Sequence, residues 1–264
     1  MMRITVLGCW GPYPRAGGAC SGYLVSGGGV NVMLEAGSGT LSRLMGHIDF
    51  RALDAVVVTH LHHDHYLDLF QLRHAVEGAR RAGSRDKPLK LYIPSRPDGE
   101  FSLLNSYKEA FAVKAIDSLA EEEITGGFAG RRLEIGGLAV RFIPARHLLP
   151  GYSVSFERSG KFVFSSDTAR TDGLIALAAG ADLFLCEASG LDSDAGHMEG
   201  AHLTARQAGE VGRAAGVKRL LLTHFWPEYD LAELSAQAAA GFGGPVTAVR
   251  EDETYTCIPI ANEG

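Results

Sequence analysis

The stretch of the chain with the densest reactive chemistry is residues 59–65, which read Thr-His-Leu-His-His-Asp-His. His60 and His62 are two positions apart, so on an extended loop their side chains point to the same side. Asp64 and His65 are adjacent and must point in different directions. Neutral imidazole and carboxylate groups are ligands that zinc accepts in proteins. The spacing predicts one metal ion on His60 and His62 and a second on Asp64 and His65, the alternative being a polar loop with chance histidines.

A strand and a helix are expected to hold this loop in place. Residues 53–58 are an apolar, β-branched run that is typical of a buried strand. Asp68 is placed to cap a helix that begins near Leu69 and carries Leu72 and Val76 on the same face. In open α/β layers, ligands are bound where strands end and helices begin, which is where the histidines fall.

Three further candidate ligands also follow predicted strands. His147 comes after a strand at residues 138–143 and would complete a three-histidine set with His60 and His62. Asp167 follows a predicted hairpin and, taken alone, is either a ligand or the N-cap of the next helix. His224 ends another apolar strand. These strand ends are where additional metal ligands are expected.

The histidine loop resembles the H-x-H-x-D-H signature of the metallo-β-lactamase fold superfamily. The resemblance implies an α/β fold, a four-layered αβ/βα sandwich, with a dinuclear metal site at one edge and Asp167 as the bridging carboxylate. The full ligand set that it implies is His60, His62, Asp64, His65, His147, Asp167 and His224.

Two positions depart from that signature. Glu35 stands where the superfamily usually has aspartate, and it is either a partner of the metal loop or a turn residue that ends a strand. Asp68 stands where glycine is common, which would alter the tightness of the loop. Outside the signature, His47 and His74 are expected to be structural or surface residues.

The second half of the chain resembles the ribonuclease Z-type branch of the superfamily. The resemblance rests on Glu187-Ala188, on His202-x-Thr204 and on residues 216–225. It implies that His202 protonates the leaving group and that Glu187 orients His202, with Thr204 as a helix N-cap. The alternative for His202 is a histidine on a surface loop.

One feature of the tRNA-processing members is missing. They carry a long basic arm between the third histidine and the bridging aspartate, whereas residues 148–166 read as a single hairpin here. The net charge is −6, and binding of tRNA depends on neutralising phosphates. We therefore expect a small-molecule or nucleotide substrate and consider tRNA an unfavourable partner.

Length and composition fit one large domain over residues 1–264. Of the 264 residues, 46% are hydrophobic and 21% are charged, which suits a single α/β core. The four cysteines are far apart in the sequence and are expected to be free thiols, as in a reducing compartment. No run of residues is typical of a signal peptide or a membrane span, so the predicted location is cytoplasmic. Residues 99–113 are expected to form a helix.

The expected function is hydrolysis of a small nucleotide or RNA-type phosphodiester by water activated between two Zn²⁺ ions, with Mn²⁺ or iron as other metals. Asp64 would bind metal and also orient the attacking group, and His202 and Glu187 would supply the proton. The alternatives are hydrolysis of a lactone, β-lactam, thioester or sulfate ester, a di-iron oxidoreductase, or a metal-binding protein without catalysis. The resemblance is compatible with a homodimer.

Overall fold

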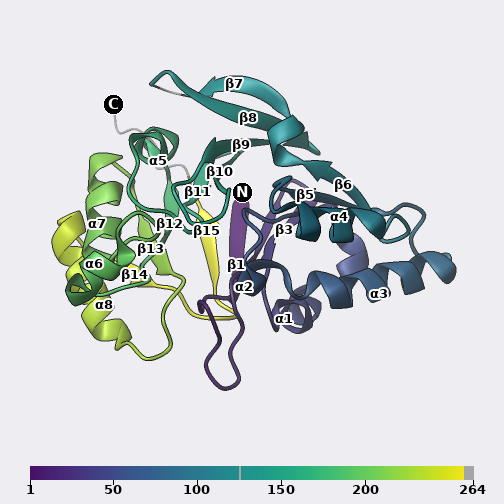
Figure 1. Ribbon diagram of the computed structural model, residues 1–264, viewed down its shortest axis with the longest axis horizontal. Coiled ribbons are helices and arrows are strands. Elements are labelled where there is room, and N and C mark those ends of the chain that lie inside the picture. The colour runs from purple at the N-terminus through teal and green to yellow at the C-terminus, as the bar shows by residue number, and fades with distance from the viewer. Residues whose placement is uncertain (125, 259–264) are drawn as a thin grey trace.

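The computed structural model describes residues 1–124 and 126–258, and its centre consists of two mixed β-sheets that pack against each other (Figure 1). The first sheet has the strand order β15-β1-β2-β3-β4-β5-β6 and the second β14-β13-β12-β11-β10-β9-β8-β7. The first consists of β1 Met2–Gly8, β2 Gly22–Gly27, β3 Val30–Ala36, β4 Ala55–Val57, β5 Leu89–Ile93, β6 Phe111–Ala115 and β15 Thr254–Cys257. The second consists of β7 Ala120–Ile124, β8 Phe128–Ile135, β9 Leu138–Pro144, β10 Tyr152–Glu157, β11 Lys161–Phe164, β12 Leu183–Glu187, β13 Leu220–Thr223 and β14 Thr247–Ala248.

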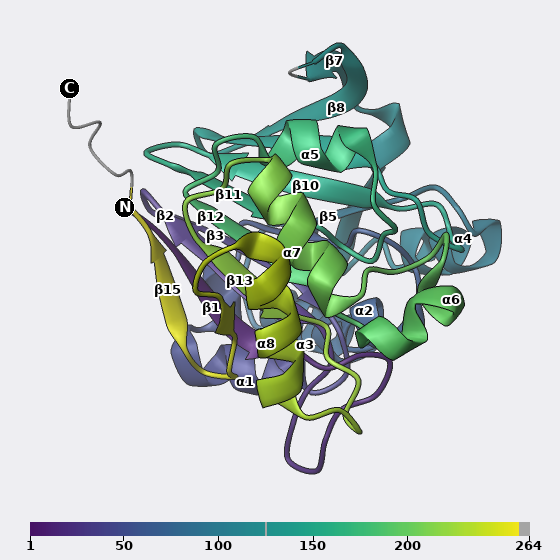
Figure 2. The same ribbon diagram turned by 90° about the vertical axis from the view of Figure 1, so that its left-hand side faces the viewer.

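Helices cover the outer face of each sheet, as the two perpendicular views show (Figures 1 and 2). On the first sheet lie α1 Thr40–His47, α3 Leu69–Arg81 and α4 Asp98–Ser106, and α2 His63–Tyr66 lies near its edge. On the second lie α5 Asp172–Ala178, α7 Ala205–Ala214 and α8 Leu231–Phe242, and α6 Ala195–Met198 precedes α7. Short 3-10 turns occupy Phe50–Ala52, Ile116–Ser118 and Asp192–Asp194. The layers run helix, sheet, sheet, helix, so the predicted αβ/βα sandwich is confirmed.

The strand that leads to the histidines is buried on both of its faces. Ala55 and Val57 contribute to the apolar core between the two sheets, whereas Val56 and Val58 contribute to the core beneath the helices of the first sheet. A central parallel strand covered on both sides needs such a continuous apolar run. This is the reason why residues 53–58 do not alternate between apolar and polar side chains.

The sheet topology brings the predicted site together. The pairs β3–β4 and β4–β5 are parallel, and so are β11–β12 and β12–β13. Carboxyl ends of parallel neighbours lie at the same edge of a sheet. The loops after β4, β11 and β13 therefore meet at one rim of the sandwich.

The prediction of one helix over residues 99–113 is wrong in its second half. Helix α4 ends at Ser106, and β6 then pairs in parallel with β5, with Leu89 opposite Phe111. Phe111 is buried, and Val113 packs against the same core as a partly buried residue. Pairing at the open edge of the first sheet decides this segment, and local pattern alone does not reveal such pairing.

Asp68 caps a different helix from the one predicted. It precedes α3, but its side chain makes no capping bond there. Its Oδ2 instead accepts a hydrogen bond of 2.7 Å from the backbone amide of Leu41, in the first turn of α1. Asp68 thus ties α1 to the end of the histidine loop.

Three smaller expectations can also be compared with the structure. Residues 148–166 contain only the antiparallel hairpin β10–β11, without an arm. All four cysteines are buried and free, as predicted. Within residues 1–124 and 126–258, every helix is too short or too polar to cross a membrane.

Candidate metal centre

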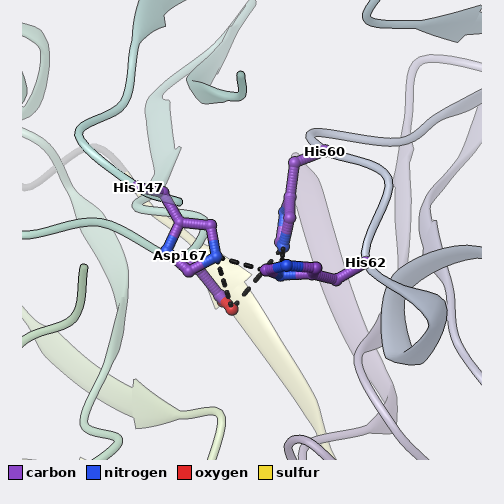
Figure 3. Close-up of side chains that lie close together, drawn as sticks. All are labelled: His60, His62, His147 and Asp167. Carbon is purple, nitrogen blue, oxygen red and sulfur yellow. Dashed lines mark hydrogen bonds and ion pairs between the residues drawn. The ribbon is translucent and has the colours of Figure 1, made fainter. Parts of the chain in front are cut away.

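The structure brings together all seven residues predicted to bind metal. The loop after β4 supplies His60 and His62, and the short helix α2 that follows supplies Asp64 and His65. The loops after β9, β11 and β13 supply one each. Potential ligand atoms form three groups, and within each group these atoms lie within 4.8 Å of one another; the third group, Asp167, His202 and His224, shares two residues with the other two. The first group is His60, His62, His147 and Asp167, whose side chains point toward a common centre in Figure 3. The second is Asp64, His65 and His224.

In the first group, neighbouring polar atoms orient the imidazole rings. The Nδ1 of His147 donates a 2.8 Å hydrogen bond to the carbonyl oxygen of Ala201, and the Nδ1 of His60 lies 3.3 Å from the Thr59 hydroxyl. The Nε2 atoms of both rings then face the Nδ1 of His62, at 3.0 Å and 3.1 Å. Three ring nitrogens converge in this way, an arrangement that suits a shared cation.

The second group is oriented in the same way. His224 donates from Nδ1 to the Ser189 hydroxyl oxygen at 2.9 Å, and the Nδ1 of His65 lies 3.3 Å from a Glu35 carboxylate oxygen. Their Nε2 atoms face Asp64 Oδ2, at 3.2 Å and 3.5 Å. A buried partner on the outer nitrogen leaves the inner nitrogen of each ring free to bind metal.

Asp167 lies between the two groups. Its Oδ2 is 3.6 Å from His60, 3.5 Å from His65 and 3.3 Å from His224, measured to Nε2 in each ring. Burial opposes its ionised form, but the imidazoles of His224 and His65 outweigh this and hold the pKa of Asp167 well below its usual value. Burial also lowers the pKa of His60 well below its ordinary value, which favours the neutral form that binds metal.

The donor set passes a test of fit for metal ions. Among the described residues, Asp167 Oδ1 and His65 Nε2 are buried without any hydrogen-bond partner, and so are His65 Nδ1 and Glu35 Oε2, which form only an ion-pair contact with each other. Buried polar atoms are rarely left in this state, because desolvation costs about 1–3 kcal/mol for each. A cation bound by Asp167 Oδ1 and His65 Nε2 would remove that cost for these two atoms. The imidazoles and carboxylates present therefore fit a metal site.

Glu35 acts as a partner of the metal loop, which decides between the two interpretations that the sequence left open. It is fully buried at the end of β3. One carboxylate oxygen accepts a 3.0 Å hydrogen bond from the backbone amide of Thr59, and the other faces His65. The longer side chain thus holds both the start of the histidine loop and one of its rings.

The backbone is strained around the site. Glu35, Ser166 and His224 have φ values of 60°, 58° and 57°, in the left-handed region that residues other than glycine seldom adopt. Each such residue costs roughly 1–3 kcal/mol, and such strain gathers at functional sites. The strained backbone thus lowers the stability of the fold, and it occurs at the strand ends that carry the site.

Sequence reasoning missed three residues that position the ligands. Ser189 bridges His224 and Glu187, because its hydroxyl accepts from the former and donates to the latter. A Cβ on Gly11 would lie 2.1 Å from His224 Nε2, and a Cβ on Gly37 would lie 2.0 Å from the Asp64 carbonyl oxygen. The Gly/Pro-rich composition around Gly11 indicated a loop, but it did not indicate that the His224 ring would lie against Gly11.

His202 and Glu187 form a hydrogen-bonded pair beside the metal centre. Glu187 lies at the end of β12 and is 1% exposed. Its Oε2 accepts a 3.1 Å bond from His202 Nδ1, and its Oε1 accepts a 2.5 Å bond from the Thr168 amide. Burial opposes protonation of His202, but the Glu187 carboxylate outweighs it and raises the pKa of His202 to about 9. Thr204 is the N-cap of α7, as predicted.

A cavity of about 440 Å³ opens over the metal centre. His62, Asp64 and His224 line its polar side, and His202 is part of its wall. Its apolar lining consists of Pro12, Met198 and the exposed Trp226. The cavity therefore joins a charged reaction centre to an apolar wall.

Comparison with known proteins places these features in a family. Residues 19–225 match the model of the "Beta-lactamase superfamily domain". The chain is 30% identical over 247 residues to the "Probable metallo-hydrolase YhfI" of Bacillus subtilis. The alignment covers 93% of this chain and 96% of that protein. The crystal structure of YhfI superposes with a TM-score of 0.87 at 28% identity, over 96% and 98% of the two chains.

More distant relatives have names that concern RNA. A ribonuclease Z of Streptomyces coelicolor is 28% identical over 306 residues, with 98% of this chain and 97% of that one covered. The short form of human tRNase Z has a TM-score of 0.73 at 21% identity, over 98% and 100% of the chains, and shows likeness of fold alone.

Proposed function

The chain belongs to the β-lactamase superfamily and carries the His/Asp metal site of a metallo-hydrolase, and we propose that it is a dinuclear zinc phosphodiesterase that cleaves a small nucleotide or RNA-type phosphodiester. The observation that carries the proposal is the His202–Glu187 pair beside the metal groups. A phosphodiester needs both parts, because its phosphoryl group is anionic and its leaving alkoxide must be protonated.

Each group of donors has a place for one ion. His60, His62, His147 and Asp167 would hold the first, and Asp64, His65 and His224 would hold the second with Asp167 between them. When bound, two divalent cations polarise the phosphoryl group and make a nucleophile available from water at neutral pH. The charges of Asp64 and Asp167 cancel only part of the cationic charge, so the centre favours an anionic substrate.

The protein's own residues then perform the proton transfer. Glu187 holds the Nδ1 proton of His202, which leaves the opposite ring nitrogen as the donor. As the phosphorus–oxygen bond to the leaving group breaks, that nitrogen gives its proton to the leaving oxygen. Asp64 is both a potential metal ligand and part of the cavity wall, and from there it orients the attacking group.

The cavity supports a small nucleotide as the substrate. Trp226 offers an aromatic ring on which a base can stack, a contact worth about 1–3 kcal/mol, and Met198 and Pro12 add apolar surface. A relative of 28% identity has the name ribonuclease Z, which supports an RNA-type diester. The net charge of −6 and the short β10–β11 hairpin do not favour a tRNA-sized partner.

The first test measures metal content and substrate class together. The purified protein is loaded with zinc, its metal is quantified, and it is assayed on bis(p-nitrophenyl) phosphate and on an activated lactone. We expect two zinc ions per chain and phosphodiester cleavage that Asp64→Ala abolishes. Two zinc ions with cleavage of the lactone alone would reject the phosphodiesterase and favour an acyl substrate.

A further inference from the structure

A second cavity lies on the other side of His202. It has a volume of about 450 Å³ and is lined by Arg146, Ala169, Arg170, Gly196, Glu199 and His202, and we call it the arginine pocket. The segment 195–200 separates the two cavities: Met198 faces the catalytic one, whereas Gly196 and Glu199 face the arginine pocket. His202 is in the wall of both, so a leaving group that receives its proton lies at the entrance to the second.

Backbone hydrogen bonds fix the two arginines side by side. Arg146 donates from its amide to the Thr168 hydroxyl at 3.0 Å, and its carbonyl oxygen accepts from the Ala169 amide at 2.8 Å. Arg170 is the next residue along the chain. These bonds join the loop that carries His147 to the loop that carries Asp167, so the side chains of Arg146 and Arg170 begin close to each other.

Both guanidinium groups remain available to a ligand. Neither forms a hydrogen bond or ion pair with another side chain in residues 1–124 and 126–258, whereas Arg43, Arg141 and Arg206 each pair with a carboxylate. The Arg146 head lies over Gly200, since a Cβ there would be 3.9 Å from Nη2. Small residues such as Ala169 and Gly196 keep the floor of the pocket open.

Two further features bear on the charge that the pocket prefers. Gln207 lines it as the third residue of α7, so the positive end of that helix borders the pocket. Glu199 is the opposing charge and weakens the attraction for anions. Two arginines against one glutamate leave an excess of positive charge in a protein that is acidic as a whole.

We propose that the arginine pocket binds a second phosphate, carried by the leaving group of the substrate. This rests on the proposed function, since it places the scissile diester at the metal centre and a terminal phosphate beyond His202. A guanidinium group pairs with two phosphate oxygens at once, which makes arginine the suitable residue. The substrate is then a short oligonucleotide or dinucleotide with a terminal phosphate, in preference to a simple diester.

The test compares a dinucleotide, ApA, with its terminally phosphorylated forms pApA and ApAp. We expect one of these two forms to have a kcat/KM about tenfold above that of ApA, from hydrogen bonds between charged groups at a partly exposed site. In the double variant Arg146→Ala, Arg170→Ala this ratio falls to about one, and in Glu199→Gln it rises. Arg81→Ala, which removes an exposed arginine at the end of α3, is the matched control and keeps the ratio.

A binding measurement separates this proposal from the proposed function. Calorimetry on Asp64→Ala protein measures the affinities for ApA, pApA and ApAp with and without the two arginines. If the wild type cleaves no phosphodiester but the affinity for pApA or ApAp still depends on the arginines, the function is rejected and the phosphate pocket stands. Equal affinity with and without the arginines, or a wild type that cleaves ApA, pApA and ApAp equally well, overturns the pocket.

Discussion

Removal of the proton donor gives the sharpest test of the mechanism. His202→Ala deletes the imidazole beside Glu187 but leaves the seven predicted metal ligands in place. A positioned general acid contributes roughly a hundredfold to ten-thousandfold, which is about 3–5 kcal/mol of barrier. Glu187→Gln keeps the imidazole but loses a buried, charge-assisted bond worth about 1.5–3 kcal/mol, so its rate should fall roughly tenfold to a hundredfold.

The size of the loss should depend on the leaving group. A nucleoside alkoxide needs protonation as it departs, whereas a nitrophenolate is stable as an anion and needs little. Steady-state assays on ApA and on bis(p-nitrophenyl) phosphate should therefore show a large fall in kcat on the former and a small one on the latter. Zinc content is measured in parallel and should remain unchanged. His74→Ala is the matched control, because this histidine lies on α3 with its side chain 69% exposed.

Two outcomes would refute this reasoning. An equal loss on both substrates would mean that His202 does not protonate the leaving group. A loss of zinc in step with the loss of rate would mean that His202 acts as a metal ligand. His202 is close enough for this to be tested, because its Nδ1 lies 4.0 Å from Asp167 Oδ2.

Other perturbations probe the support of the site. Ser189→Ala removes the hydroxyl that holds His224, so zinc affinity should fall roughly tenfold to a hundredfold in a competition titration. Gly11→Ala forces the His224 ring aside and should leave less than two zinc ions per chain, whereas Gly46→Ala, in open space on α1, should retain both. Asp68→Ala should cost about 1 kcal/mol in denaturant unfolding through the lost cap of α1, with unchanged zinc affinity. Chelation of zinc should lower Tm by several degrees, because zinc at a thousand times its Kd stabilises the fold by about 4 kcal/mol; an unchanged Tm would argue against a metal centre in the folded protein.

Much of this protein can be predicted from local sequence. A buried strand, a histidine-rich loop and a helix follow one another between residues 53 and 81, and each has its own pattern in the sequence. His147, Asp167 and His224 could be proposed because each follows a short apolar strand, and strand ends are where α/β folds hold ligands. The hairpin β10–β11 and the N-cap Thr204 are equally local features.

Tertiary structure alone decided the features that depend on distant neighbours. Asp68 caps α1 because that helix starts beside it, and residues 111–115 form a strand because β5 offers an unpaired edge. Ser189 and Gly11 gain their roles through His224, which is far from both in sequence. The arginine pocket likewise exists only where two metal-binding loops join. Short-range patterns specify which atoms can bind metal, but the packing of the two sheets determines which atoms meet.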